Sequence, residues 1–190
     1  MSQALTYTRD PNTGRIVRRR ASSGTVLLLD TSGSMTLCDA GNQRRIDVLA
    51  TVLADVLQGV QLQAAATFDS IVEEIPLTGS INLPEPRGST AMHDAMAWAL
   101  QQPEQPKRIV VLSDGEPDDM AACADHAQTC KARGIVLDAY YCGPPHDLRA
   151  KEFMANMAAS TGGQSGQFKL TGPESKNVSD ALILRIGHSK

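Results

Sequence analysis

Aromatic side chains are scarce in this chain of 190 residues and make up only 4% of it. A hydrophobic core therefore has to be built from aliphatic residues, and the 42% hydrophobic content is sufficient for one domain of this length. Buried parallel strands that are covered by helices with small side chains suit such a composition. The composition therefore favours a single α/β domain.

The sequence also lacks closely paired cysteines and long apolar runs. Its four cysteines include no C-x-x-C pair and are too scattered for a disulfide framework or a typical zinc site. No apolar stretch is long enough to cross a bilayer, and the polar N-terminus does not resemble a signal peptide. We therefore expect a cytoplasmic protein with reduced thiols and no membrane partner.

Charge is distributed unevenly along the chain. Residues 1–23 carry five arginines and one aspartate, so this segment is +4 and the remainder is −7, within a formal net charge of −3. The turn-forming residues 10–14 predict a hairpin or extended arm that packs on the acidic body or on a neighbouring molecule. Nucleic-acid binding through the arginines is an alternative, but so short an arm favours a solvated or self-docking segment. We therefore divide the chain into a basic arm, residues 1–23, and a domain, residues 24–190.

Strand-like and helix-like segments alternate along residues 24–190. Apolar, β-rich runs cover residues 25–29, 61–68, 71–75, 108–112, 135–141 and 167–170. Helical periodicity and end signals mark residues 46–57, 91–101, 118–133, 149–160 and 178–186. The second and third runs are close enough for a tight hairpin, so one of them is expected to be an antiparallel edge strand. We predict an α/β fold with a Rossmann-like, doubly wound, mostly parallel sheet, helices on both faces, and ligands at the carboxyl ends of the strands.

Oxygen-bearing side chains lie in three of the polar turns. Asp30, Ser32 and Ser34 form an Asp-x-Ser-x-Ser turn after the first strand, Thr90 lies in a Gly-Ser-Thr turn, and Asp114 follows the clearest buried strand. Because the carboxyl ends of parallel strands share one edge of a sheet, these five side chains can converge. Five small oxygen donors with only two negative charges suit a hard cation, Mg²⁺ or Mn²⁺ with Ca²⁺ as a further candidate.

This pattern resembles the metal-ion-dependent adhesion site, or MIDAS, of von Willebrand factor A (VWA) domains. All five positions match, and the resemblance covers about residues 24–186. It implies that Ser32, Ser34 and Thr90 ligate the ion, and that Asp30 and Asp114 act largely through water. It further implies that an Asp or Glu side chain of a partner supplies the last ligand.

The resemblance implies a metal-dependent protein-interaction module of the stand-alone prokaryotic type, and not an enzyme. Such relatives accompany AAA+ ATPases and stress-response clusters, so the expected partner is one of these proteins or a copy of this chain. A metal-dependent phosphohydrolase of the haloacid dehalogenase type is the alternative, but its nucleophile is followed two residues later by an acid, where this chain has Ser32. The chain contains no G-x-x-x-x-G-K-[ST] loop and no G-x-S-x-G elbow, which argues against NTPase and serine hydrolase chemistry.

Other polar residues near these turns have a structural interpretation. Asp118 is expected to cap the helix that follows it, and His93 is expected to lie on a solvated helix face. Cys38, in a polar loop, is expected to be exposed, whereas Cys123 and Cys130 are expected to be small buried residues. Ser89 occupies a position where many VWA relatives have a second glycine, which stiffens the turn but removes no ligand.

Overall fold

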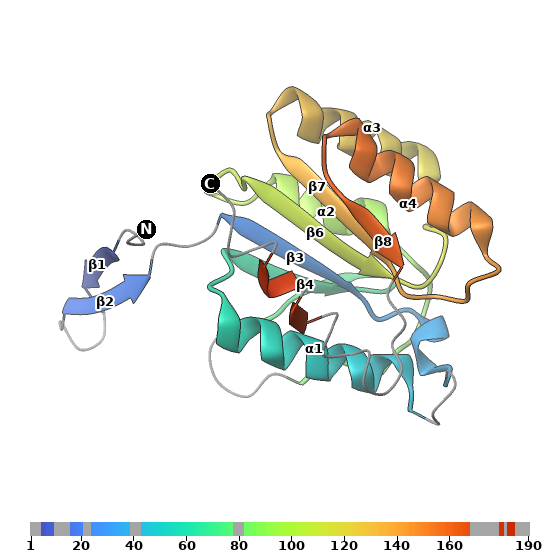
Figure 1. The fold of residues 1–190 in the computed structure, drawn as a ribbon, viewed down its shortest axis with the longest axis horizontal. Helices are drawn as coiled ribbons and strands as arrows, with labels where there is room; N and C mark the ends of the chain where they lie inside the picture. Colours follow the sequence, from blue (N-terminus) through green and yellow to red (C-terminus); the bar gives the residue numbers. More distant parts are fainter. Residues whose placement is uncertain are drawn as a thin grey trace.

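In the residues that the computed structural model describes, which are 5–9, 16–20, 24–38, 43–77, 82–167, 179–180 and 182–184, six strands form a central sheet (Figure 1). They are β3 (Thr25–Asp30), β4 (Ala64–Phe68), β5 (Val72–Glu74), β6 (Arg108–Ser113), β7 (Val136–Tyr141) and β8 (Ser165–Gln167). Their order is β5-β4-β3-β6-β7-β8, with β5 antiparallel to β4 and the other neighbours parallel. The predicted Rossmann-like sheet with one antiparallel edge strand is confirmed.

Helices cover both faces of this sheet (Figure 1). One face packs against α1 (Arg45–Gly59), and the other packs against α2 (Met92–Leu100), α3 (Met120–Ala132) and α4 (Leu148–Ser160). The side chains of β3 alternate between the layers, with Val26 and Leu28 on the three-helix side and Leu27 and Leu29 on the α1 side. Burial on both faces explains why residues 26–29 of this strand are all apolar.

The chain order of the strands places a topological switch point between β3 and β6 at their carboxyl edge, which is here termed the crevice. From β3 the chain passes through α1 to β4 on one side, and later through α2 to β6 on the other side of β3. The loops that follow β3 and β6 therefore depart in different directions from adjacent strands, which is where open α/β sheets bind ligands. Asp30 ends β3 and Asp114 directly follows β6, so both acids are delivered to this crevice.

Several element boundaries differ from the sequence predictions. The strand predicted from residue 61 begins at Ala64, and α3 is capped by Asp119, whose side chain accepts a hydrogen bond from the backbone N–H of Ala122, and not by Asp118. The last strand is β8, although residues 168–170 of the predicted strand lie outside the described residues. Residues 179–180 and 182–184 are helical as predicted, and the remainder of that segment is not described.

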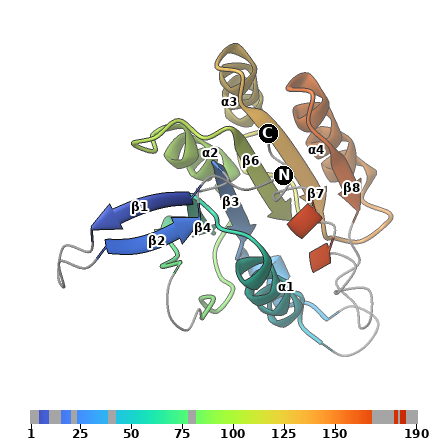
Figure 2. The same ribbon diagram turned by 60° about the vertical axis from the view of Figure 1, so that its left-hand side comes forward.

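The basic arm contains the predicted hairpin, since β1 (Leu5–Arg9) pairs antiparallel with β2 (Ile16–Arg20). Figure 1 shows these strands standing away from the central sheet, and Figure 2 shows the same pair from a second direction. Packing of the arm on the body or on a neighbouring molecule stays a prediction. Within the described residues, no helix is long and apolar enough to cross a membrane.

The packing of α1 on the sheet can be tested with a leucine on its buried face. Leu49 is 0% exposed, so Leu49→Ala should lower the free energy of unfolding by about 2–5 kcal/mol through lost burial and the cavity left behind. The control is Leu148→Ala, because Leu148 is 60% exposed and its truncation should change stability by less than about 0.5 kcal/mol. Urea unfolding measures both, and equal effects would contradict the described position of α1.

Candidate functional site

Asp30 is a fully buried acid at the end of β3. The backbone N–H of Ser32 donates to its Oδ1 at 2.7 Å, and the hydroxyl of Ser113 donates to its Oδ2. Burial, and next the negative charge of Asp114, raise the pKa of Asp30 to about 6, although these hydrogen bonds act in the opposite direction. A cation placed near Asp30 would offset both of the effects that disfavour its charge.

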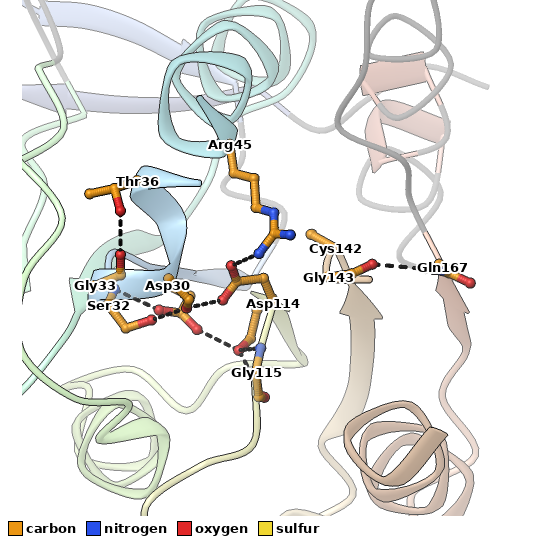
Figure 3. Close-up of polar contacts among 12 residues, drawn as sticks. Asp30, Ser32, Gly33, Thr36, Arg45, Asp114, Gly115, Cys142, Gly143 and Gln167 are labelled. Carbon is orange, nitrogen blue, oxygen red and sulfur yellow. Dashed lines mark hydrogen bonds and ion pairs between the residues drawn. The ribbon is translucent and has the colours of Figure 1, made fainter. Parts of the chain in front are cut away.

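Asp114 is the second buried acid, and its two oxygens have different partners (Figure 3). The hydroxyl of Ser34 donates to Oδ1 at 2.6 Å, while Nη1 of Arg45 lies 2.6 Å from Oδ2. The hydroxyl oxygens of Ser32 and Ser34 are 3.1 Å apart. Four of the five predicted site residues therefore lie in one connected polar cluster, held by the turn that includes the 3₁₀ helix η1 (Gly33–Thr36).

Thr90 belongs to a neighbouring loop that is tied to this turn. The backbone N–H of Gly33 donates to the carbonyl of Gly88, and the backbone N–H of Arg87 donates to the carbonyl of Thr31. Gly88 has a φ of 65°, and a Cβ at this position would lie 2.3 Å from the hydroxyl oxygen of Ser70 in the turn between β4 and β5, so glycine suits this position. The side chain of Thr90 is not hydrogen-bonded to the other four site residues.

The backbone and the side chain of Thr90 have contrasting environments. Its N–H donates to both carboxylate oxygens of Asp118 at 3.1 Å, and its carbonyl accepts from the N–H of Asp118. This is why Asp118 does not cap α3 as predicted. The Thr90 hydroxyl has no hydrogen-bond partner among the described residues although the residue is only 8% exposed, so it can serve a ligand without breaking a protein contact.

Sequence reasoning missed Arg45 and Ser113, which help to organise the site, and assigned Asp118 to the capping of a helix. Ser113 directly precedes Asp114 and donates to Asp30, while Asp118 follows Asp114 by four residues and accepts from the N–H of Thr90. The available signal for Ser113 was its position at the carboxyl end of β6. Arg45 is 69 residues away from Asp114 in the sequence. The only signal for its role is that it stands at helical spacing from the buried apolar residues of α1.

The remaining candidates do not form a second centre. Burial raises the pKa of Cys123 to about 12 and that of Cys130 to about 11, so both stay thiols, and Cys38 is exposed as predicted. The side chain of His93 is only 27% exposed and its Nδ1 is buried without a partner, so the predicted solvated position is wrong. Within the described parts of the chain, no three His, Cys, Asp or Glu side chains could hold a metal together, so an ion in the crevice would need the hydroxyls.

Comparisons with known proteins place this geometry in a family. The sequence profile of the von Willebrand factor type A domain matches residues 61–166, which include Thr90 and Asp114 but begin after Ser34. No curated protein matches the chain.

Several solved structures have the same fold at low sequence identity. The VWA domain of SpRpn10 is 13% identical with a TM-score of 0.62, and the match covers 83% of this chain and 93% of that one. The manganese-loaded TRAP protein of Plasmodium vivax is 18% identical with a TM-score of 0.62, over 85% of this chain and 72% of that one. Proximal thread matrix protein 1 from the mussel byssus, with a zinc-occupied MIDAS motif, is 18% identical with a TM-score of 0.63, over 85% of this chain and 45% of that one.

These neighbours show the fold alone, and this chain spans less than half of the mussel protein. The profile match, by contrast, extends over more than half of this chain, in agreement with the sheet order and the crevice described above. The chain therefore belongs to the von Willebrand factor type A domain family.

Proposed function

We propose that this domain binds one divalent cation through Asp30, Ser32, Ser34, Thr90 and Asp114, and that the cation captures a carboxylate of a protein partner. Domains of this family generally mediate metal-dependent protein–protein interaction and are typically not enzymes. The observation that carries the proposal is the meeting of two buried acids and two serine hydroxyls beside a threonine hydroxyl that has no partner among the described residues.

The spacing of the oxygens fits a small octahedral ion. Adjacent oxygen ligands of an ion with bonds of about 2.1 Å lie about 3 Å apart. The hydroxyl oxygens of Ser32 and Ser34 are 3.1 Å apart, and the Ser34 hydroxyl is 2.6 Å from the nearer oxygen of Asp114. The separation of the two serine hydroxyls therefore suits adjacent ligands of such an ion, and the shorter contact is a hydrogen bond, which fits an acid that acts through water.

The chemistry of the donor set favours a hard cation. Carboxylate and hydroxyl oxygens suit Mg²⁺ and Mn²⁺, with Ca²⁺ as a third candidate. The manganese of the TRAP structure and the zinc of the mussel structure support a divalent cation in this fold. When bound, the ion would supply a Lewis-acidic position for a carboxylate oxygen.

Hydrogen bonds within the chain fix the orientation of the two acids at this position. Ser113 and the N–H of Ser32 fix the carboxylate of Asp30, while Ser34 fixes that of Asp114. Ser32 stands where a phosphohydrolase of the haloacid dehalogenase type would carry its acid, so the site lacks the proton donor which that reaction needs. An AAA+ ATPase, a stress-response protein or a second copy as partner, and a cytoplasmic location, stay predictions from the sequence.

Thr90 provides the cleanest test of metal binding. Thr90→Val removes a hydroxyl that no described residue uses, so it should weaken Mn²⁺ affinity by about tenfold or more with little effect on stability. Asp114→Ala is less suitable, because it would also remove a carboxylate that pairs with the buried guanidinium of Arg45. Isothermal titration calorimetry measures the affinity.

The matched control is Thr25→Val, since Thr25 is a buried threonine at the opposite end of β3. Its replacement should leave Mn²⁺ affinity unchanged. Unaltered affinity in Thr90→Val would show that the metal, if bound, lies elsewhere.

Capture of a partner should depend on the metal. A pull-down with the full chain should retain the partner in Mg²⁺ or Mn²⁺ and lose it in EDTA or with Thr90→Val, because the partner carboxylate needs the ion. Mass spectrometry identifies the retained protein, and Asp→Ala and Glu→Ala substitutions across it locate the carboxylate. Retention that survives both EDTA and Thr90→Val would place the interface elsewhere and make the metal at most structural.

A further inference from the structure

Two arginines begin α1 in very different environments. Arg44 is partly exposed and pairs with the surface acids Asp47 and Glu85 at 2.8 and 2.7 Å. The Arg45 side chain is only 4% exposed and reaches the Asp114 carboxylate, which is itself 0% exposed (Figure 3). A cation is therefore built into the crevice beside one of the two acids proposed to hold the metal.

We infer that Arg45 is an internal counter-cation of the metal site, which holds Asp114 in the metal-free domain and competes with the divalent ion for this carboxylate. This inference rests on the proposed function and describes how occupancy of the same site is regulated. The guanidinium stays charged at any physiological pH, so the competition is permanent and not a response to pH.

The geometry of Asp114 supports competition. Its Oδ1 accepts the Ser34 hydroxyl and its Oδ2 faces Arg45, so both oxygens are engaged before an ion arrives. An ion that binds near this carboxylate must share it with the Arg45 guanidinium, whose Nη1 lies 2.6 Å from Oδ2 of Asp114. In this buried setting two positive charges repel each other more strongly than in water. Arg45 therefore lowers the affinity for the metal while it stabilises the domain without metal.

The charge balance gives the arrangement a second consequence. Without the ion, Arg45 stands against three acids, Asp30, Asp114 and Asp118, so the crevice is net negative. A divalent ion together with Arg45 offsets these three charges. A carboxylate is therefore repelled from the crevice without the ion, and this repulsion is removed when the ion is bound, which makes partner capture depend on the ion.

The experiment compares the full wild-type chain with Arg45→Gln, using Mn²⁺ as the probe. Calorimetry should show affinity for Mn²⁺ increased by about tenfold or more when the competing charge is removed. In EDTA, Arg45→Gln should lower Tm by roughly 5–10 °C, because two buried acids lose their counter-charge. The rise in Tm on adding Mn²⁺ should be larger for Arg45→Gln than for the wild type.

The chain supplies two matched controls. Arg44→Gln removes the same charge from the adjacent position, and should change neither Tm nor affinity appreciably because its pairs are on the surface. Arg108→Gln breaks the buried pair between Asp138 and Arg108, the first residue of β6. Arg108 therefore lies at the opposite end of this strand from Asp114. The substitution should lower Tm without changing Mn²⁺ affinity, and so separates loss of stability from loss of competition.

Arg45→Lys keeps the positive charge but lacks the planar guanidinium, so its affinity for Mn²⁺ should lie between those of the wild type and Arg45→Gln. If Arg45→Gln does not fold, Arg45→Lys takes its place in the comparison. Equal or weaker Mn²⁺ binding by Arg45→Gln, or by Arg45→Lys in its place, would overturn the inference. Failure of the wild type alone to bind Mn²⁺ would overturn the proposed function but support Arg45 as the competitor. Failure of both wild type and variants would overturn both.

Discussion

Two carboxylates are buried side by side at the carboxyl edge of the sheet, and the surrounding structure depends on offsetting their charge. Asp30 and Asp114 follow adjacent parallel strands, so the sheet itself forces them together. Burial and the charge of Asp114 raise the pKa of Asp30 to about 6, so the folded chain favours charge on Asp30 less than water does. Hydrogen bonds from Ser32, Ser34 and Ser113, together with the Arg45 guanidinium, partly offset the charges of the two acids.

The fold was predictable because the pattern of apolar residues reports burial on both faces of the sheet. Runs such as β3 and β6 are apolar at every core position, whereas the helices carry their apolar residues on one side. Boundaries were less accurate where no side chain marks the end of a strand. Residues 61–63 look β-like in sequence, but the strand register with β3 begins at Ala64, preceded by one backbone hydrogen bond from Gln63 to Thr25, and the sequence contains no signal for that register.

The clustering of Asp30, Ser32, Ser34 and Asp114 was accessible to sequence reasoning because these residues stand at or just after the carboxyl ends of two adjacent parallel strands. Arg45 was missed because it stands in a polar segment next to an exposed arginine. Its spacing to Leu49, Val52 and Val56 places it on the buried face of α1, at successive intervals of about one helical turn. A charged residue in phase with an apolar stripe implies a buried partner, but nothing in one sequence identifies that partner as an acid 69 residues away.

The neutral ligands of the proposed site decide what it can do. If an acid replaced Ser32, Ser34 or Thr90, its carboxylate would offset more of the positive charge of the divalent ion and Arg45. An external acid would then gain little by approaching. An acid at position 32 would also supply the proton transfer that a phosphohydrolase requires. Hydroxyls provide oxygen ligands without charge, so the ion retains a positive charge that only a ligand from outside the chain can offset. The hydroxyl side chains at these positions therefore make hydrolysis unfavourable and capture of a carboxylate favourable.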